Sequence, residues 1–305
     1  MGDNGGNMHQ GALGKPKGIV SILFSMTHAP SFRARSADII AAIRPRAVRL
    51  ADKLEARSRS LVAMLNLRME GIIVGWIAVV VALGLIKVAL ASQGRFGLVP
   101  FLVTLLPYLL IAAAPIVGYR VTSGSFPSGL ISAQPLVRLC WYGTWRKVDP
   151  LTARQSPGFG PSGFMASLLV GILLNVPLRS FEFMLAMPAI PPSAPIWATH
   201  LMIAMTVDVV VMNFFYMVCF VMALRSVPLF PRLLLFAWVV DVAMQFAIAH
   251  YAISAPGLPA GVAGGLQNLL DGNLKKVMIS AFVWLPYLIL SDRVNLTFRQ
   301  RVRVA

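Results

Sequence analysis

The stretch FMASLLVGILLNVPLRSFEFMLAM, residues 164–187, decides the fold class. It is as long as the run of about 20 mainly apolar residues that a helix needs to cross the hydrocarbon core of a bilayer. It also carries Asn175, Arg179 and Glu182. Ionisable groups at membrane depth normally face the interior of a helix bundle, where they find partners. The stretch therefore predicts membrane-spanning helices with charged side chains between them.

The composition of the whole chain points to the same class. Of its 305 residues, 57% are hydrophobic and 12% are charged, and the mean hydropathy is +0.74. A soluble protein carries about 25% charged residues, so an ordinary soluble enzyme is excluded. Cys140 and Cys219 are the two cysteines, which excludes a disulfide framework and a cysteine-based metal site.

Apolar runs of spanning length predict an all-α, polytopic membrane protein with six transmembrane helices. The two least regular runs are the fifth and the sixth. The expected spans are Gly71–Leu90, Leu98–Tyr119, Phe164–Met187, Trp197–Leu224, Leu233–Ala252 and Asn273–Leu290.

The positive charges are distributed very unevenly around these spans. The net charge is +16, and one side of the spans holds 22 Lys and Arg residues against three on the other, where Lys275 and Lys276 at the start of the sixth span are counted. The positive-inside rule then places both termini in the cytoplasm, and we expect a bacterial inner membrane protein. No basic stretch is interleaved with stacking aromatic residues, so nucleic-acid binding is not expected.

Composition and periodicity divide the chain further. From residue 36 to 70, leucines at helical spacing alternate with Arg and Lys, which predicts a basic amphipathic helix. It is expected to lie on the anionic inner leaflet, or alternatively to dock a cytoplasmic partner. The remaining segments are a disordered N-terminus (1–35), the first transmembrane pair (71–119), a cytoplasmic or interfacial loop (120–163), a four-helix transmembrane unit (164–290) and a basic cytoplasmic tail (291–305).

The sequence contains two glycine motifs, of which one indicates helix packing and the other lacks the context that a cofactor site needs. Gly71 and Gly75 form a GxxxG motif in the first span, which indicates close helix packing, either within the bundle or in a homo-oligomer. Gly158, Gly160 and Gly163 spell GxGxxG, but they follow a Pro-rich loop and precede an apolar span. A dinucleotide site needs the motif between a strand and a helix of a βαβ unit, so no cofactor is expected. Catalytic and metal-binding motifs are also missing from the sequence, so we predict neither an enzyme nor a metal site.

Helix direction and rise place the buried polar residues in two layers. In the outer layer Arg179 should pair with Asp208, and Glu182 lies one turn from Arg179. Below it Asp241, with no cation at its depth, should face Asn175 and Asn213. The candidate pathway or helix-tie residues are Arg179, Asp208, Asp241, Glu182, Asn175, Asn213 and Gln245.

These residues leave two functions open. An unpaired Asp241 would be a proton carrier in a small-solute or proton-coupled permease. Alternatively, buried pairs such as Arg179–Asp208 fix the helix arrangement of a non-transporting subunit that assembles a larger membrane complex.

The end of the sixth span carries a family resemblance. Trp284, Pro286 and Tyr287 precede the segment SDRVNLTF, residues 291–298. This ending resembles a bacterial multi-pass membrane family catalogued as domain of unknown function 2569, and the resemblance covers the last four spans. It implies an architecture and no mechanism. Arg293 and Arg299 are expected to face anionic lipid at the cytoplasmic leaflet.

Overall fold

The computed structural model describes residues 32–93, 97–129, 131–135, 143–253 and 256–304, with side chains from residue 52 onward. Most of the segment 1–35, predicted to be disordered, therefore lies outside the described residues. Residues 1–54 and residues 55–305 form two separate compact units. All contacts below lie within the second unit.

The all-α class and the six spans are confirmed. The structure is 79% helical, and six helices in the described part of the chain are long and apolar enough to cross a membrane. This makes the chain a multi-pass membrane protein. Its helices are α2 (Phe32–Ser92), α3 (Leu98–Ser125), α4 (Pro150–Gln155), α5 (Phe164–Ala186), α6 (Ile196–Leu224), α7 (Phe230–Ile253), α8 (Ala260–Leu290) and α9 (Asp292–Arg299).

The boundaries differ from the prediction in three places. The amphipathic segment and the first span form one continuous helix, α2. Helix α8 begins at Ala260, well before the expected Asn273. The apolar run that predicts the span covers only the residues suited to hydrocarbon, and the helix also includes the more polar residues 260–272. The loop 120–163 and the tail contain the strands β1 (Trp145–Lys147) and β2 (Arg301–Arg303), which pair antiparallel.

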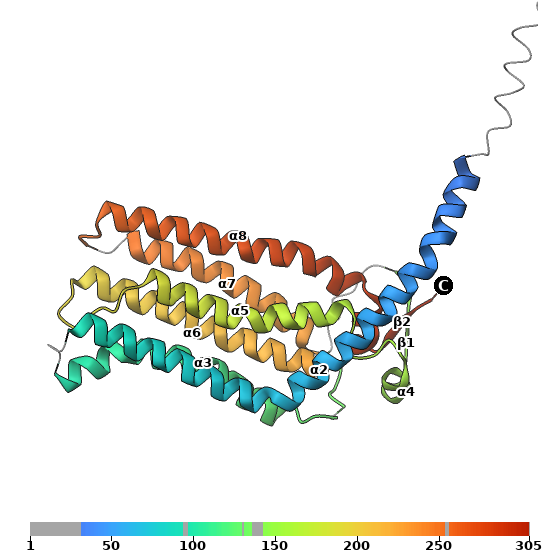
Figure 1. The fold of residues 1–305 in the computed structure, drawn as a ribbon, viewed down its shortest axis with the longest axis horizontal. Helices are drawn as coiled ribbons and strands as arrows, with labels where there is room; N and C mark the ends of the chain where they lie inside the picture. Colours follow the sequence, from blue (N-terminus) through green and yellow to red (C-terminus); the bar gives the residue numbers. More distant parts are fainter. Residues whose placement is uncertain (1–31, 94–96, 130, 136–142, 254–255, 305) are drawn as a thin grey trace, which may run out of the picture. The chain divides into compact units, whose positions relative to one another are not determined.

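Helix α6 is the central helix of the bundle. It packs against α3, α5 and α7, and α8 packs against α7. Figure 1 shows these helices side by side, with β1, β2 and α4 gathered at one end. At the α3–α6 crossing, a Cβ on Gly118 would lie 2.9 Å from the carbonyl oxygen of Phe214, so only glycine permits this close approach.

The spans alternate in direction, as six spans require. Arg225, which follows α6, donates a hydrogen bond of 2.7 Å to the carbonyl oxygen of Ser123 and another to that of Phe126. The last turns of α3 and α6 therefore lie together, and Figure 1 shows the two strands at this same end. We call this end, with α4, α9, β1 and β2, the ribbon end.

The GxxxG motif does not pack within the bundle. Gly71 and Gly75 are both exposed, and a Cβ added to either would meet no atom within 4 Å. Of the two alternatives for this motif, packing inside the bundle is wrong, because the face of α2 that packs on α3 is a different one, and packing in a homo-oligomer stays a prediction. Its Trp76 donates to the carbonyl oxygen of Ala112 over 3.0 Å.

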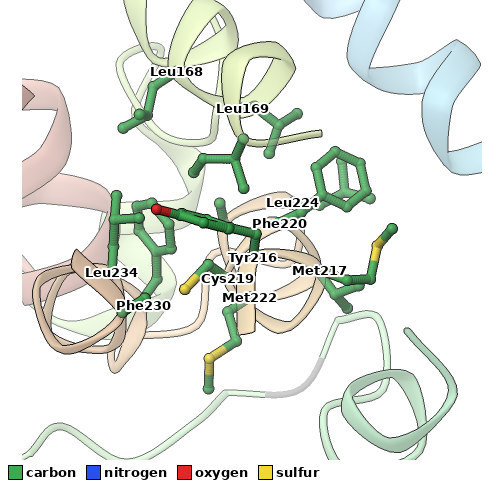
Figure 2. Packing of buried hydrophobic residues seen from close by; sticks show 14 of the residues in the cluster. Leu168, Leu169, Tyr216, Met217, Cys219, Phe220, Met222, Leu224, Phe230 and Leu234 are labelled. Atoms are coloured by element: carbon green, nitrogen blue, oxygen red, sulfur yellow. The ribbon is translucent and has the colours of Figure 1, made fainter. Parts of the chain in front are cut away.

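Two apolar clusters fill the bundle, one toward each end. On α6, the cluster nearer the ribbon end begins at Met212, and the other ends at Val209. On α5 the corresponding limits are Val176 and Phe183. Figure 2 shows part of the first cluster, with the Tyr216 ring among aliphatic and aromatic side chains of α5, α6 and α7. The boundary between the clusters is where the buried charges lie.

Candidate functional site

One guanidinium binds two carboxylates at the boundary between the apolar clusters. Arg179 on α5 donates from Nη1 to Oδ2 of Asp241 over 2.9 Å and from Nη2 to Oδ1 over 2.7 Å. The same Nη2 donates to Oδ2 and Oδ1 of Asp208, over 2.9 and 3.2 Å. The side chains of Arg179, Asp208 and Asp241 are 9%, 2% and 0% exposed. Three helices, α5, α6 and α7, are thus joined through one arginine.

Neutral side chains complete the coordination of the carboxylates. The hydroxyl of Tyr216 donates to Oδ2 of Asp241 over 2.7 Å. Nε2 of Gln245 donates to Oδ1 of Asp208 over 3.2 Å and to Oδ1 of Asp241 over 3.4 Å. Asn273 on α8 donates to Oε1 of Gln245 over 3.4 Å, which links the fourth helix. We call Arg179, Asp208, Tyr216, Asp241, Gln245 and Asn273 the charge cluster.

The predicted pairing of Arg179 with Asp208 is confirmed, whereas the isolation of Asp241 is wrong. A helical side chain points back toward the N-terminus of its helix. The N-terminus of α5 is at the ribbon end, so the long side chain of Arg179 descends toward Asp241. The two expected layers are therefore one.

The other candidate residues lie beside the cluster. Glu182 forms an ion pair with Lys276 of α8, and their side chains are 41% and 60% exposed. Asn175 is half-buried and makes no hydrogen bond with the cluster. Asn213 is fully buried and donates to Oγ of Ser180 over 2.8 Å. Asp241 therefore faces neither of the two asparagines, because it is held by Arg179 instead.

Sequence reasoning missed Tyr216, Ser180 and Asn273. Tyr216 could have been found, because it lies two turns after Asp208 on the same face of α6. Asn273 was placed at the end of a span, where an amide needs no buried partner. The earlier start of α8 moves this residue into the helix interior.

The formal charge of the cluster does not balance. One guanidinium faces two carboxyl groups, which leaves a charge of −1 if both are ionised. A net charge in a low-dielectric interior is costly, and one bound proton removes it. Two buried polar atoms, Nε of Arg179 within the charge cluster and Oδ1 of Asn213 beside it, have no hydrogen-bond partner among the described residues.

The basic residues at the end of α8 have a structural role. Arg299 is 6% exposed and donates to the carbonyl oxygen of Leu288 over 2.8 Å and to Oδ1 of Asn295 over 3.0 Å. Arg293 donates to Ser162 and forms an ion pair of 3.2 Å with Glu55. The expectation that both arginines face lipid is wrong, because α9 folds back onto the bundle and uses both side chains internally.

The GxGxxG loop, residues 158–163, forms hydrogen bonds with α2 and α9. The amide of Gly163 donates to Oγ of Ser58 over 2.7 Å, and that of Gly160 donates to Oγ1 of Thr297 over 3.0 Å. Glu55 precedes the apolar run that starts at Gly71, and its hydrogen bond from Arg293 holds the pKa of its carboxyl below the usual value. The loop therefore joins α2 to α9.

Replacing Gly160 with alanine is expected to destabilise the protein by about 1–3 kcal/mol, because φ at this position is +95° and a side chain there is strained. Gly171→Ala is the matched control, since Gly171 lies exposed in α5 with no atom within 4 Å of an added Cβ. Helix propensity predicts no loss for the control. Thermal unfolding in detergent measures both, and equal midpoints would contradict the role of Gly160.

The comparisons with known proteins give no further assignment. No protein-family model, no curated protein and no solved structure matches this chain. The resemblance of the last four spans to domain of unknown function 2569 therefore remains a proposal.

Proposed function

We propose that this protein is a proton-coupled permease for a small solute, with the charge cluster as its proton site. The observation that carries the proposal is the shared guanidinium of Arg179, which faces the two carboxyl groups of Asp208 and Asp241. A single proton changes the cluster from a formal charge of −1 to neutral. Proton carriers in membrane transporters are typically such buried acidic groups on facing helices.

The position of the cluster suits a coupled movement of helices. It lies between two apolar clusters and touches α5, α6, α7 and α8, so its charge state affects the packing of all four. Pro177 lies two residues before Arg179 inside α5 and removes one backbone donor there. Interrupted helices beside buried charges recur at transporter sites. The free Nε of Arg179 and Oδ1 of Asn213 offer one donor and one acceptor to a bound molecule.

The proposed membrane is a bacterial inner membrane with the ribbon end in the cytoplasm. Within the second unit, the α3–α5 and α6–α7 connections and the segment after α8 lie at this end, and they hold more Lys and Arg than the connections at the other end. Positive residues on the cytoplasmic side are the general rule for such proteins.

Infrared spectroscopy of the purified protein tests the proton site without knowledge of the solute. We expect a protonated carboxyl band at neutral pH that disappears in Asp241→Asn, because the amide removes the excess negative charge and leaves no proton to share. Asp271→Asn is the control, since Asp271 is exposed on α8. A band unchanged by Asp241→Asn would contradict the proposal that the charge cluster binds a proton.

Uptake into proteoliposomes tests the transport itself. A mixture of labelled amino acids, sugars and organic acids is offered under an inward proton gradient. Wild type and Asp271→Asn should show uptake that depends on pH, and Asp241→Asn should show none while its thermal unfolding midpoint is kept. Uptake by Asp241→Asn with unchanged pH dependence would contradict coupling through the cluster.

The alternative is a non-transporting subunit of a larger complex. The larger cavities among the described residues favour it, because they are lined mainly by apolar side chains and no residue of the charge cluster lines them. One of these cavities, of about 460 Å³, lies between α3 and α6. In that case purification in mild detergent should yield a stoichiometric partner that is lost on removing residues 1–69.

A further inference from the structure

The two short strands at the ribbon end form a surface with one strongly basic face. The register pairs Trp145 with Arg303, Arg146 with Val302, and Lys147 with Arg301. Directly opposed side chains of an antiparallel pair lie on the same face, and successive residues alternate between faces. One face therefore carries Trp145, Lys147, Arg301 and Arg303, and we call it the basic face. The other face carries Arg146 and Val302.

Two like charges of the basic face oppose each other across the ribbon, the strand pair of β1 and β2. Lys147 and Arg301 are direct cross-strand neighbours, and like charges in this position destabilise a strand pair. None of the ion pairs found in the described part of the chain includes Lys147 or Arg303. Asp149, the nearest acidic residue after β1, is engaged elsewhere, because its Oδ2 accepts from the amide of Leu151 over 3.0 Å. An external anion would offset the positive charges of Lys147 and Arg303.

The aromatic residue of the face is fixed beside the cations. The guanidinium of Arg303 lies over the Trp145 ring, 5.6 Å from its centroid. Lys147 and Arg303 are both exposed, so their charged groups are accessible. An indole next to exposed cations is the combination that membrane proteins place at the level of the lipid headgroups.

The basic face also lies close in the chain to a membrane span. Helix α8 ends at Leu290, and only the eight residues of α9 and Gln300 separate it from β2. Eight helical residues extend about 12 Å. Because α9 folds back against the bundle, as the buried Phe298 shows, the ribbon is kept close to the end of the bundle rather than projected away from it.

We propose that the basic face of the ribbon binds the phosphate groups of anionic phospholipids at the surface of the bilayer. The exposed side chains of Lys147 and Arg303 would contact the phosphates, the half-buried Arg301 would add positive charge beside them, and Trp145 would lie among the headgroups. Lys147 and Arg303 therefore take the lipid-binding role predicted for Arg293 and Arg299, which the structure shows to be engaged internally. The site is independent of the charge cluster and of any transport activity.

Titration with fluorescent phosphatidylglycerol tests the proposal. The full-length protein in neutral micelles doped with phosphatidylcholine is titrated, and binding is followed by anisotropy. Each cation near an anionic surface contributes roughly fivefold in affinity, so Lys147→Gln with Arg301→Gln and Arg303→Gln should weaken binding by about 100-fold. Arg146→Gln is the matched control, because Arg146 is exposed and next to Lys147 but on the opposite face.

The variants and competitors distinguish binding of phospholipid at the basic face from a general attraction of anions to a positively charged protein. Wild type and Arg146→Gln should bind equally well and lose affinity at high salt. Equal binding by the triple variant, or an equal loss in Arg146→Gln and Lys147→Gln, would overturn the proposal. So would saturation of the site by inorganic phosphate or by a single-stranded oligonucleotide at the concentrations at which phosphatidylglycerol binds. If the triple variant unfolds, the comparison of Lys147→Gln with Arg146→Gln decides the result.

Discussion

Arg179→Ala is expected to lower the free energy of unfolding by about 3–5 kcal/mol, because it leaves two buried carboxyl groups without their cation. Asp208 and Asp241 are 1% and 0% exposed, so water cannot replace the guanidinium without opening the bundle. The hydrogen bonds from Tyr216 and Gln245 remain, but they carry no positive charge to offset the carboxylates.

The same loss should be largely reversed by removing the stranded charges. Adding Asp208→Asn and Asp241→Asn to Arg179→Ala makes the site neutral, and we expect this triple variant to be more stable than the single one. Unfolding in mixed micelles with increasing denaturing detergent measures all forms. Arg68→Ala is the control, since Arg68 is exposed on α2. A triple variant less stable than Arg179→Ala would show that hydrogen bonding, and not charge, holds the three helices together.

Phe298→Ala should be the second most damaging substitution, at about 3–5 kcal/mol. Phe298 is fully buried, and its ring lies 5.0 Å from that of Phe230, measured between centroids. Its removal leaves a cavity between α9 and the start of α7. The packing of the whole segment after α8 depends on this contact, because residues 294–299 are all buried.

Thermal unfolding of the purified protein measures the effect, and limited proteolysis locates it. Phe298→Ala should expose sites in α9 and β2 to protease before the spans unfold. Val304→Ala in the same segment is the control, since Val304 is 50% exposed and should tolerate the change. If both variants unfold at the same temperature as wild type, the stability of the protein does not depend on the packing of the segment after α8.

The spans could be predicted from sequence because hydropathy and length report directly on the bilayer. The structure has all six, and the errors are confined to the ends. Residues 260–272 of α8 are helical but too polar to be read as part of a span, and the hydropathy of a segment says nothing of where a helix stops. Strands β1 and β2 were missed because each has three residues, and their pairing depends on a contact between distant segments.

The charge cluster could be predicted in part. Arg179, Asp208 and Asp241 were identified because charge at membrane depth is costly and therefore conspicuous. Their individual partners could not be derived, since depth along a helix ignores the length and direction of a side chain. A residue that reaches several ångströms toward its own N-terminus joins groups that a count of helical turns keeps apart.

For the arginines after α8, the sequence predicts lipid contact where the structure shows internal hydrogen bonds. Arg293 and Arg299 follow an apolar span, and in most membrane proteins such residues meet lipid headgroups. Here Asn295 donates to the carbonyl oxygens of Ile289 and Ser291, each over 3.0 Å, and turns the chain back. A local pattern of charges cannot reveal that turn, because it depends on hydrogen bonds to the end of the preceding helix.

The pairing of β1 with β2 has a consequence for biosynthesis. β1 precedes α5, whereas its partner follows α8, so four helices must be made and inserted before the two strands can meet. Until then the nascent chain presents β1 unpaired at the membrane surface. Closure of the ribbon is therefore a late event of assembly, and it requires that α5 to α8 have already been inserted with the correct alternation.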